Sequence, residues 1–322
     1  MVMNNLKSKY QGLIVGGAIG DALGMPAEGL SYEDIKRLFG SIQYYLKPPK
    51  TSKLHYLKPG QYTDDTQLML ATIKSITDNK LIRIENIVKE LLKANESIRG
   101  AGRTTWTALN KLSRVGPKNS GIKGALGTGA MTRVAPLAIL SSKRSDFCYD
   151  ILVEDAVKIT HDSEIAKKSA LLYGRILTDL LEGYQRDLRS RGGIRNFVEN
   201  YSKIHPKNSE ETIKLKQQLG SLTELVELDE EEFVEANDTT GKIQNVLPAA
   251  LYCFLKSPKN FEESVLRAVN LGGDTDTIGF IAGQLSGAYN GVGTIPKYLI
   301  SELENHPEIR ESGNRLYQLI HP

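Results

Sequence analysis

The stretch GLIVGGAIGDALGMPAE, residues 12–28, carries the strongest structural pattern in this chain. Its glycines recur every four residues, at Gly12, Gly16, Gly20 and Gly24. Residues four apart lie on one face of an α-helix, and each interior glycine costs about 1 kcal/mol relative to alanine. A row of glycines therefore needs a compensating gain, and the close approach of another backbone is the obvious one. We predict a core helix here, packed through its glycine face.

A second glycine row lies near the other end of the chain, at Gly279, Gly283 and Gly287. Its four-residue spacing again places the glycines on one helical face. We therefore predict that the two helices are neighbours in the core. If they run antiparallel, the end of the first helix, with Asp21, lies beside Asp274 at the start of the second.

Helical periodicity dominates the rest of the sequence, and convincing alternating strands are absent. No helical repeat of fixed period is present, which disfavours a solenoid. Composition changes near residues 185–193 and 227–235 are compatible with a domain boundary, but the site described below draws on both halves of the chain. We expect an all-α array in a single domain spanning residues 1–322. Further helices are predicted over residues 66–77, 82–96, 151–160, 165–181, 261–269 and 278–289.

The composition is typical of a folded protein. The chain has 322 residues, a length compatible with one large core, and 40% of them are hydrophobic and 25% charged. The formal net charge is +3, and Lys and Arg are scattered, which argues against a dedicated nucleic-acid-binding protein. Two cysteines, Cys148 and Cys253, are too few for a disulfide framework. We expect both in the core of a protein from a reducing cytoplasm.

The beginning of the chain has some features of a signal peptide, because Lys7 and Lys9 precede the apolar residues 12–20. That stretch is glycine-rich, ends at Asp21, and is far shorter than the ~20 apolar residues that a membrane span needs. We interpret it as the first core helix. We expect a cytoplasmic protein, taken as a monomer, without a membrane or nucleic-acid partner.

The first cluster of chemically active residues is Thr63, Asp64, Asp65 and Thr66, directly before an amphipathic helix. Thr and Asp are common at this position because they cap free backbone N–H groups. One acidic cap is routine, whereas two adjacent carboxylates between two threonines exceed what capping needs. On this cluster alone, the structural and the functional interpretation are about equally supported.

The second cluster is GGDTDT, residues 272–277, again at the entrance to a helix. Paired glycines permit unusual backbone dihedrals or the close approach of a ligand. Asp274 and Asp276 stand at alternate positions, where both carboxylates can turn toward one point. The two clusters together predict a shared acidic site.

Four carboxylates and several hydroxyls, with no His or Cys among them, are the donors that hard cations prefer. This set suits Mg²⁺ or Mn²⁺ and argues against zinc. Without cations, like-charge repulsion would force some carboxylates to protonate. Two divalent ions would balance the four charges, and pairs of metals ~3.5–4 Å apart recur in hydrolases.

Three other features are weak when each is taken alone. Glu28 follows the end of the first helix, where a surface residue is the better interpretation on spacing. Gly127, Thr128 and Gly129 precede a helical run, and such an entrance can bind phosphate through its free N–H groups, although most merely turn the chain. The same applies to residues 100–102, which also stand before a helical stretch.

His161 and Asp162 lie side by side after a helical segment, a pairing that also occurs as a metal ligand in helical phosphohydrolases. A lone His at such a position is usually structural. A phosphohydrolase would need a further upstream His, and the candidate is His55, in a Pro- and Lys-rich loop. This alternative would leave both acidic clusters unused.

Three motifs resemble those of the ADP-ribosylglycohydrolase family, which includes the dinitrogenase reductase activating glycohydrolases. They are GDALGMPAE at residues 20–28, TDDT at residues 63–66 and GGDTDT at residues 272–277. Their order and wide separation match the family, and the similarity is weakest over residues 185–235. The resemblance implies an orthogonal, single-domain, all-α fold with a binuclear Mg²⁺ or Mn²⁺ centre.

The resemblance also implies roles for individual residues. Glu28 matches the family's acidic residue near the scissile bond and becomes the candidate general acid/base, with Asp65 assisting metal or water placement. The expected reaction is hydrolysis at the anomeric carbon of the ribose next to the acceptor, with the metals holding the ribose hydroxyls and an activated water. The implied metal ligands are Thr63, Asp64, Asp65, Asp274, Asp276 and Thr277.

The implied contacts to ADP-ribose are Gly127, Thr128, Gly129 and His161. Thr128 departs from the family pattern, in which Asn is usual, and the following residues 131–132 are Met-Thr where Ala-Met is usual. The implied substrate is ADP-ribose linked to a protein side chain or to an O-acetyl group, and the acceptor depends on variable loops. A non-catalytic, crystallin-like ADP-ribose-binding protein is the remaining alternative.

Overall fold

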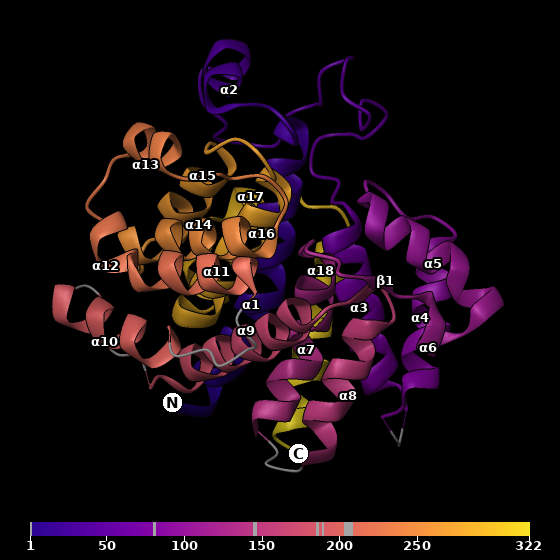
Figure 1. Ribbon diagram of the computed structural model, residues 1–322. Coiled ribbons are helices and arrows are strands. Elements are labelled where there is room, and N and C mark those ends of the chain that lie inside the picture. The colour runs from indigo at the N-terminus through magenta and orange to yellow at the C-terminus, as the bar shows by residue number, and fades with distance from the viewer. Residues whose placement is uncertain (1, 80–81, 144–146, 185–186, 189, 203–208) are drawn as a thin grey trace.

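The protein is described from a computed structural model, which is almost entirely helical (Figure 1). It describes residues 2–79, 82–143, 147–184, 187–188, 190–202 and 209–322. The all-α prediction is therefore confirmed. The α-helices are α1 Val2–Gly24, α2 Tyr32–Phe39, α3 Asp64–Thr77, α4 Ile84–Asn95, α5 Arg103–Val115, α6 Pro117–Ser120, α7 Gly129–Lys143, α8 Phe147–Lys158, α9 Glu164–Glu182, α10 Arg191–Tyr201, α11 Glu210–Gly220, α12 Leu222–Leu225, α13 Glu230–Ala236, α14 Ile243–Lys256, α15 Phe261–Val269, α16 Thr275–Asn290, α17 Lys297–Ser301 and α18 His306–Ile320.

Short elements connect these helices. The 3-10 helices η1 Met25–Ala27 and η2 Val292–Thr294 follow α1 and α16. The strands β1 Ile122–Lys123 and β2 His161–Asp162 pair in parallel, with Ile122 opposite His161.

Helices α1 and α16 pack together through their glycine rows, as the sequence predicted, and the structure shows that they run antiparallel. Gly12 lies against Gly287, and Gly20 lies against Gly279. A Cβ atom added to Gly20 would stand 1.9 Å from the carbonyl oxygen of Gly279, and one added to Gly283 would stand 2.0 Å from the nearest backbone oxygen of α1. Neither position can hold a side chain unless the two backbones move apart.

This contact sets the place of the functional site. The Thr275 hydroxyl donates a hydrogen bond of 2.8 Å to the carbonyl oxygen of Gly24, so the end of α1 is joined to the start of α16. Helix α1 ends at Gly24, and η1 with Pro26 turns the chain toward Glu28, as expected from these two residues.

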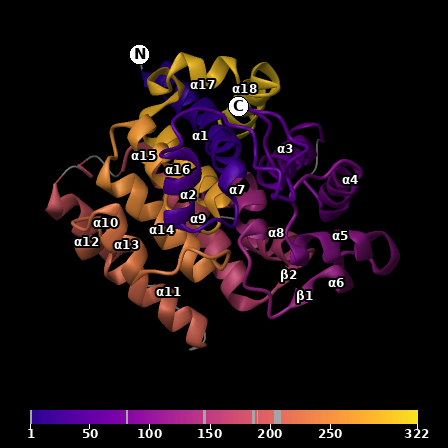
Figure 2. The same cartoon turned by 90° about the horizontal axis from the view of Figure 1, so that it is seen from above.

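The remaining helices surround this pair. Helices α14, α15 and α18 pack most extensively against it (Figures 1 and 2), and α14 and α16 are buried over nearly their whole lengths. Helices α4, α5 and α6 lie on one side of the molecule, while α10, α12 and α13 lie on the opposite side in both views. Most of the buried apolar side chains form one continuous cluster from Tyr10 to Leu316, and Met25, Leu54 and Leu57 form a second, small one.

Most of the helices expected from periodicity are present at the predicted places. The predicted helix over residues 261–269 coincides with α15, while α8 begins earlier, at Phe147. Cys253 is buried in α14 as expected, whereas the side chain of Cys148 lies outside the described set. Among the described helices, none combines the length and the apolar character needed to cross a bilayer.

Residues 185–235, where no family motif was found, contain the short helices α10 to α13. Local capping explains their boundaries. The Ser190 side chain accepts a hydrogen bond from the N–H of Gly193 at the start of α10. At the start of α13, Asp229 and Glu232 form a reciprocal capping box.

The glycine contact can be tested by replacing one of its residues. We expect Gly20→Ala to lower the free energy of unfolding by about 3 kcal/mol or more, because the added methyl group overlaps the backbone of α16. Gly220→Ala is the matched control, since a Cβ atom at this helical glycine meets nothing within 4 Å. It should be neutral or slightly stabilising. Urea unfolding measures both changes, and a Gly20→Ala variant as stable as wild type would contradict the interpretation.

Candidate active site

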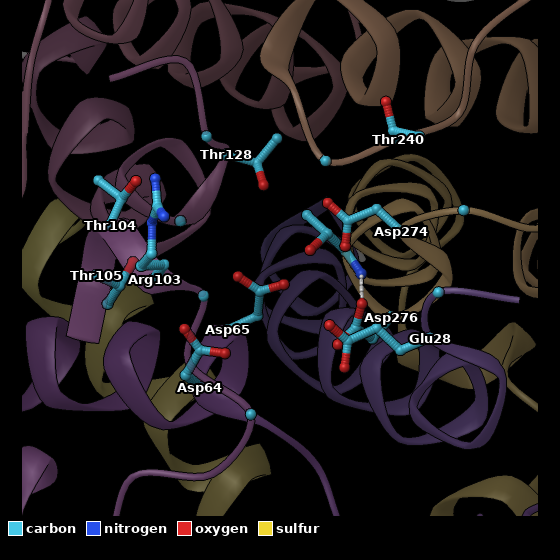
Figure 3. A pocket seen from close by; sticks show the side chains of 18 of the residues that line it. Glu28, Asp64, Asp65, Arg103, Thr104, Thr105, Thr128, Thr240, Asp274 and Asp276 are labelled. Atoms are coloured by element: carbon cyan, nitrogen blue, oxygen red, sulfur yellow. Dashed lines mark hydrogen bonds between the residues drawn. The ribbon is translucent and has the colours of Figure 1, made fainter. Parts of the chain in front are cut away.

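Five carboxylates line one pocket of about 390 Å³, at the place where α1, α3 and α16 meet. Glu28 comes from the loop after η1, Asp64 and Asp65 begin α3, and Asp274 and Asp276 stand at the start of α16. Figure 3 shows Asp64 and Asp65 on one side of the pocket and the other three carboxylates across from them. The structure therefore brings together the two acidic clusters that are far apart in the sequence.

A sixth carboxylate, Asp21, lies behind the pocket wall and organises the first cluster. Its Oδ1 accepts hydrogen bonds from the N–H of Thr63 at 2.9 Å and from its hydroxyl at 2.8 Å. Its Oδ2 accepts from the N–H of Thr66 at 3.1 Å and from its hydroxyl at 2.6 Å. Asp21 thus holds the first turn of α3 from both sides, which leaves Asp64 and Asp65 free to face the pocket.

Sequence reasoning missed this role of Asp21, although a signal was present. Two threonines flank the acidic pair, and each presents a backbone and a hydroxyl donor that need an acceptor. Complete burial raises the pKa of Asp21 to about 6, while the four hydrogen bonds from Thr63 and Thr66 oppose that rise. Thr63 itself does not line the pocket, because its hydroxyl is directed at Asp21.

Asp65 lies where the two acidic clusters face each other. The Thr132 hydroxyl donates a hydrogen bond of 2.7 Å to its Oδ1. Burial, followed by the charges of Asp21 and Asp274, raises the pKa of Asp65 to about 8, against the opposing hydrogen bonds from Thr132 and Thr277. Burial also raises the pKa of its neighbour Asp64 well above the ordinary value.

The paired glycines of the second cluster allow backbone segments to pass close to it. Gly272 and Gly273 both have φ of +79°, a conformation that favours glycine. A Cβ atom at Gly273 would stand 2.3 Å from the carbonyl oxygen of Thr239. The structure confirms the unusual backbone dihedrals that were expected at these glycines. The segment that passes close to Gly273 is protein backbone.

Glu28 lies at the rim of the pocket, next to this glycine turn. The N–H of Gly29 donates to the carbonyl oxygen of Gly273, and the N–H of Gly273 donates to that of Leu30, both at 2.8 Å. The side chain of Glu28 reaches solvent, yet the protein around it and then the charges of Asp274 and Asp21 raise its pKa to about 7. Glu28 is therefore both a surface residue and part of the pocket.

The carboxylates of the pocket have the donor chemistry that divalent cations need, but they are not already arranged around a common metal position. Within the described part of the chain, no group of three or more His, Cys, Asp or Glu side chains already stands in an arrangement that could hold a metal ion. The five carboxylates and Thr277 supply oxygen donors, which suit Mg²⁺ or Mn²⁺. Burial is the main cause of the raised pKa values of Glu28 and Asp65, and the charges of Asp274 and Asp21 add to it; bound cations would relieve this second, repulsive contribution.

The starts of two other helices add groups of the reverse electrostatic character to the lining of the pocket. Helix α5 begins at Arg103 and helix α7 at Gly129, and both starts line the pocket together with Thr128. Figure 3 shows Arg103 and Thr128 across from Asp274. Free N–H groups and the positive ends of the helix dipoles favour anions at such places.

Sequence reasoning found the loop at Gly127 to Gly129 but missed Arg103. The glycines before α5 were the available signal, since Gly100 and Gly102 also line the pocket. A glycine-rich helix entrance does not show which cavity it faces, so this assignment needed the tertiary structure.

His161 closes the pocket beneath the Gly127 loop. Its side chain is buried, and burial followed by the nearby charge of Arg133 lowers its pKa to about 3, so the ring is neutral at physiological pH. Asp162 and His55 do not line the pocket; Asp162 lies near Lys167, and His55 is exposed. The phosphohydrolase alternative therefore lacks its ligand set at this site.

Comparisons with known proteins agree with this fold. The family model described as ADP-ribosylglycohydrolase matches residues 3–322, and the chain belongs to this family. A solved structure titled ADP-ribosylglycohydrolase-related protein complex superposes with a TM-score of 0.76 and 25% sequence identity, over 98% of this chain and 99% of that one. The family supports hydrolysis of ADP-ribose glycosidic bonds as the class of activity.

Two named relatives extend over nearly the whole chain. ADP-ribosylhydrolase ARH3 of Homo sapiens is 24% identical, over 97% of this chain and 94% of its own length. The ADP-ribosyl-dinitrogen reductase glycohydrolase of Rhodospirillum rubrum is 26% identical, over 96% of this chain and 95% of its own. An uncharacterised protein of Archaeoglobus fulgidus is 28% identical, over 98% of this chain and 97% of its own length.

The organising role of Asp21 predicts a large loss of stability in Asp21→Asn. The amide nitrogen would face hydroxyl and N–H donors, so we expect the free energy of unfolding to fall by about 3–5 kcal/mol. The control is Asp155→Asn, at an exposed position on α8, which should change it by less than about 0.5 kcal/mol. Chemical unfolding measures both, and similar stabilities of the two variants would refute the role.

The buried His161 predicts a specific loss of stability in acid. Its pKa is about 3 in the folded protein, against 6.5 for an unperturbed histidine in the unfolded chain. Between these pH values the unfolded chain therefore binds more protons than the folded protein does. The free energy of unfolding should therefore fall as the pH falls, by about 2 kcal/mol from this group between pH 7 and pH 5. In His161→Gln, the free energy of unfolding measured with urea should fall between pH 7 and pH 5 by about 2 kcal/mol less than in wild type. His55→Gln, at an exposed histidine, should keep the wild-type difference, and equal losses in all three proteins would contradict the burial of His161 as a neutral ring.

Proposed function

We propose that this chain is a metal-dependent hydrolase that cleaves the glycosidic bond between ADP-ribose and an acceptor. The observation that carries the proposal is a single pocket lined both by five carboxylates and by the starts of two helices. The proposed ligands of two Mg²⁺ or Mn²⁺ ions are Asp64, Asp65, Asp274, Asp276 and Thr277. Thr63, implied as a ligand by the family resemblance, is left out because its hydroxyl donates to Asp21 and it does not line the pocket.

The groups that line the pocket suit two chemical parts of ADP-ribose, its diphosphate and the ribose next to the acceptor. The diphosphate is anionic and suits the starts of α5 and α7, with Arg103 beside them. The ribose next to the acceptor carries hydroxyls and suits the carboxylates and their cations. A ligand bound across the pocket would therefore place the scissile bond near Glu28.

The cations would supply charge stabilisation and would orient the ribose hydroxyls and the attacking water. Burial, followed by the charges of Asp21 and Asp274, raises the pKa of Asp65, and a cation beside it would favour its ionised form. The hydrogen bonds from Thr132 to Asp65 and from the N–H of Thr277 to Asp276 hold two of these groups in fixed orientations.

Glu28 is the proposed general acid/base. A group of this kind works best when its pKa lies near the working pH, and the pKa of Glu28 is raised to about 7. Its loop is joined by backbone hydrogen bonds to Gly273, so the backbone that carries Glu28 is held beside the segment that carries Asp274. Asp65 would assist in placing the metal or the water.

The proposal is tested with a panel of substrates: arginine-linked and serine-linked ADP-ribosylated peptides and O-acetyl-ADP-ribose, each with Mg²⁺, Mn²⁺ or EDTA. We expect release of free ADP-ribose that requires a metal. In Glu28→Gln we expect turnover to fall at least about 100-fold while the metal-induced rise in melting temperature remains. Glu33→Gln, at an exposed position on α2, is the matched control and should keep full turnover.

Two results would contradict the proposed hydrolase, and a third would contradict only the role of Glu28. Release of phosphate instead of ADP-ribose would support a phosphohydrolase. Calorimetric binding of ADP-ribose without turnover under any metal condition would support a non-catalytic binding protein. Full turnover of Glu28→Gln would leave the hydrolase in place but remove Glu28 from its proposed role.

A further inference from the structure

The two nitrogens of the buried His161 ring have different surroundings. Nδ1 lies 2.9 Å from the hydroxyl oxygen of Thr160, inside the protein. Nε2 lies beneath the pocket loop, because a Cβ atom added to Gly127 would stand 3.1 Å from it. Among the described residues, no hydrogen-bond partner is recorded for Nε2, although the side chain is only 1% exposed. The ring therefore holds one nitrogen available to a ligand.

The Thr160 hydroxyl joins this ring to a buried arginine. Nη2 of Arg133 donates a hydrogen bond of 2.8 Å to the hydroxyl oxygen of Thr160 and another of 3.0 Å to the carbonyl oxygen of Ala156. A guanidinium group can only donate, so the Thr160 oxygen must accept this bond. Its own proton remains to be placed.

The proton of the Thr160 hydroxyl has one recorded acceptor within the described residues, Nδ1 of His161. Thr160 is fully buried, so water does not offer another. If Nδ1 carried the ring proton, the Thr160 oxygen would receive two donors and its own proton would be left without an acceptor, a cost that buried groups rarely bear. Both groups are satisfied when Nδ1 accepts, and the ring proton then stands on Nε2.

We propose that Arg133 and Thr160 fix His161 in the tautomer protonated at Nε2, so that the pocket presents an N–H donor to an anionic oxygen of its ligand. This donor lies beside the start of α7, where free backbone N–H groups favour the same kind of ligand atom. The identity of that atom as a diphosphate oxygen of ADP-ribose rests on the proposed function. The tautomer itself does not.

Arg133 is itself difficult to explain by packing. It is fully buried, and its Nε and Nη1 have no hydrogen-bond partner in the described structure. No carboxylate pairs with it there, whereas an apolar side chain would fill the space without unpaired donors. Its function as a positioning residue gives a reason for the charge, because the guanidinium orients Thr160 and also opposes a second proton on His161.

The test is the tautomer of His161, measured by NMR on the full chain labelled with ¹⁵N-histidine, without metal. The signals of His161 are identified by their loss in His161→Gln. We expect wild type to show protonation at Nε2 alone between pH 5 and pH 8. In Thr160→Val we expect a mixture of tautomers and a Kd for ADP-ribose raised about fivefold or more, as for one weakened hydrogen bond.

Two further variants separate this effect from a general loss of packing. Thr160→Ser retains the hydroxyl and should keep both the tautomer and the affinity. Thr178→Val removes another buried hydroxyl, which donates to Gly174 on α9, and should also leave both unchanged. If Thr160→Val does not fold, the wild-type tautomer and Thr160→Ser still decide the matter.

Protonation of wild-type His161 at Nδ1, or at both nitrogens, would overturn the proposal, as would a Thr160→Val variant with unchanged tautomer and affinity. Failure of the proposed function gives a different result. If wild type shows protonation at Nε2 but binds no ADP-ribose, the tautomer assignment stands and the ligand assignment is wrong.

Discussion

The close contact between the backbones of α1 and α16 is the constraint on which the rest of the structure depends. Each glycine removes a side chain that would hold the helices apart, and the cost of seven helical glycines is offset by contact along both helices. The antiparallel arrangement then places the end of one helix beside the start of the other. The acidic pocket forms there because the chain leaves α1 toward Glu28 and enters α16 through Asp274.

Buried polar groups complete what the glycine contact begins. Asp21 satisfies four donors at the start of α3, and Thr132 orients Asp65. Elsewhere in the pocket wall, Thr160 contacts the ring of His161 directly, and Arg133 acts on that ring through its hydrogen bond to Thr160. The residues that face the cavity are thus held by a second set of residues behind them, which have little or no contact with solvent.

Much of this arrangement could be predicted from the sequence because its signals are local. The four-residue spacing of glycines identified α1 and α16 as partners, and paired Asp residues at two helix starts identified the acidic clusters. The role of Asp21 and the placement of Arg103 could not be predicted, since each depends on which distant segment lies opposite. Helices α10 to α13 were missed for another reason: they are short, and their boundaries depend on capping residues rather than on a long apolar period.

The order of the helices along the chain has a consequence for biosynthesis. The Thr275 hydroxyl and the carbonyl oxygen of Gly24 are 251 positions apart, so the glycine face of α1 leaves the ribosome long before α16 exists to cover it. Loop closure over such a separation is slow, and uncovered apolar surface invites association with other chains. The nascent protein therefore passes through a long period in which its central helix lacks its partner, and neither half of the chain can assemble the pocket alone.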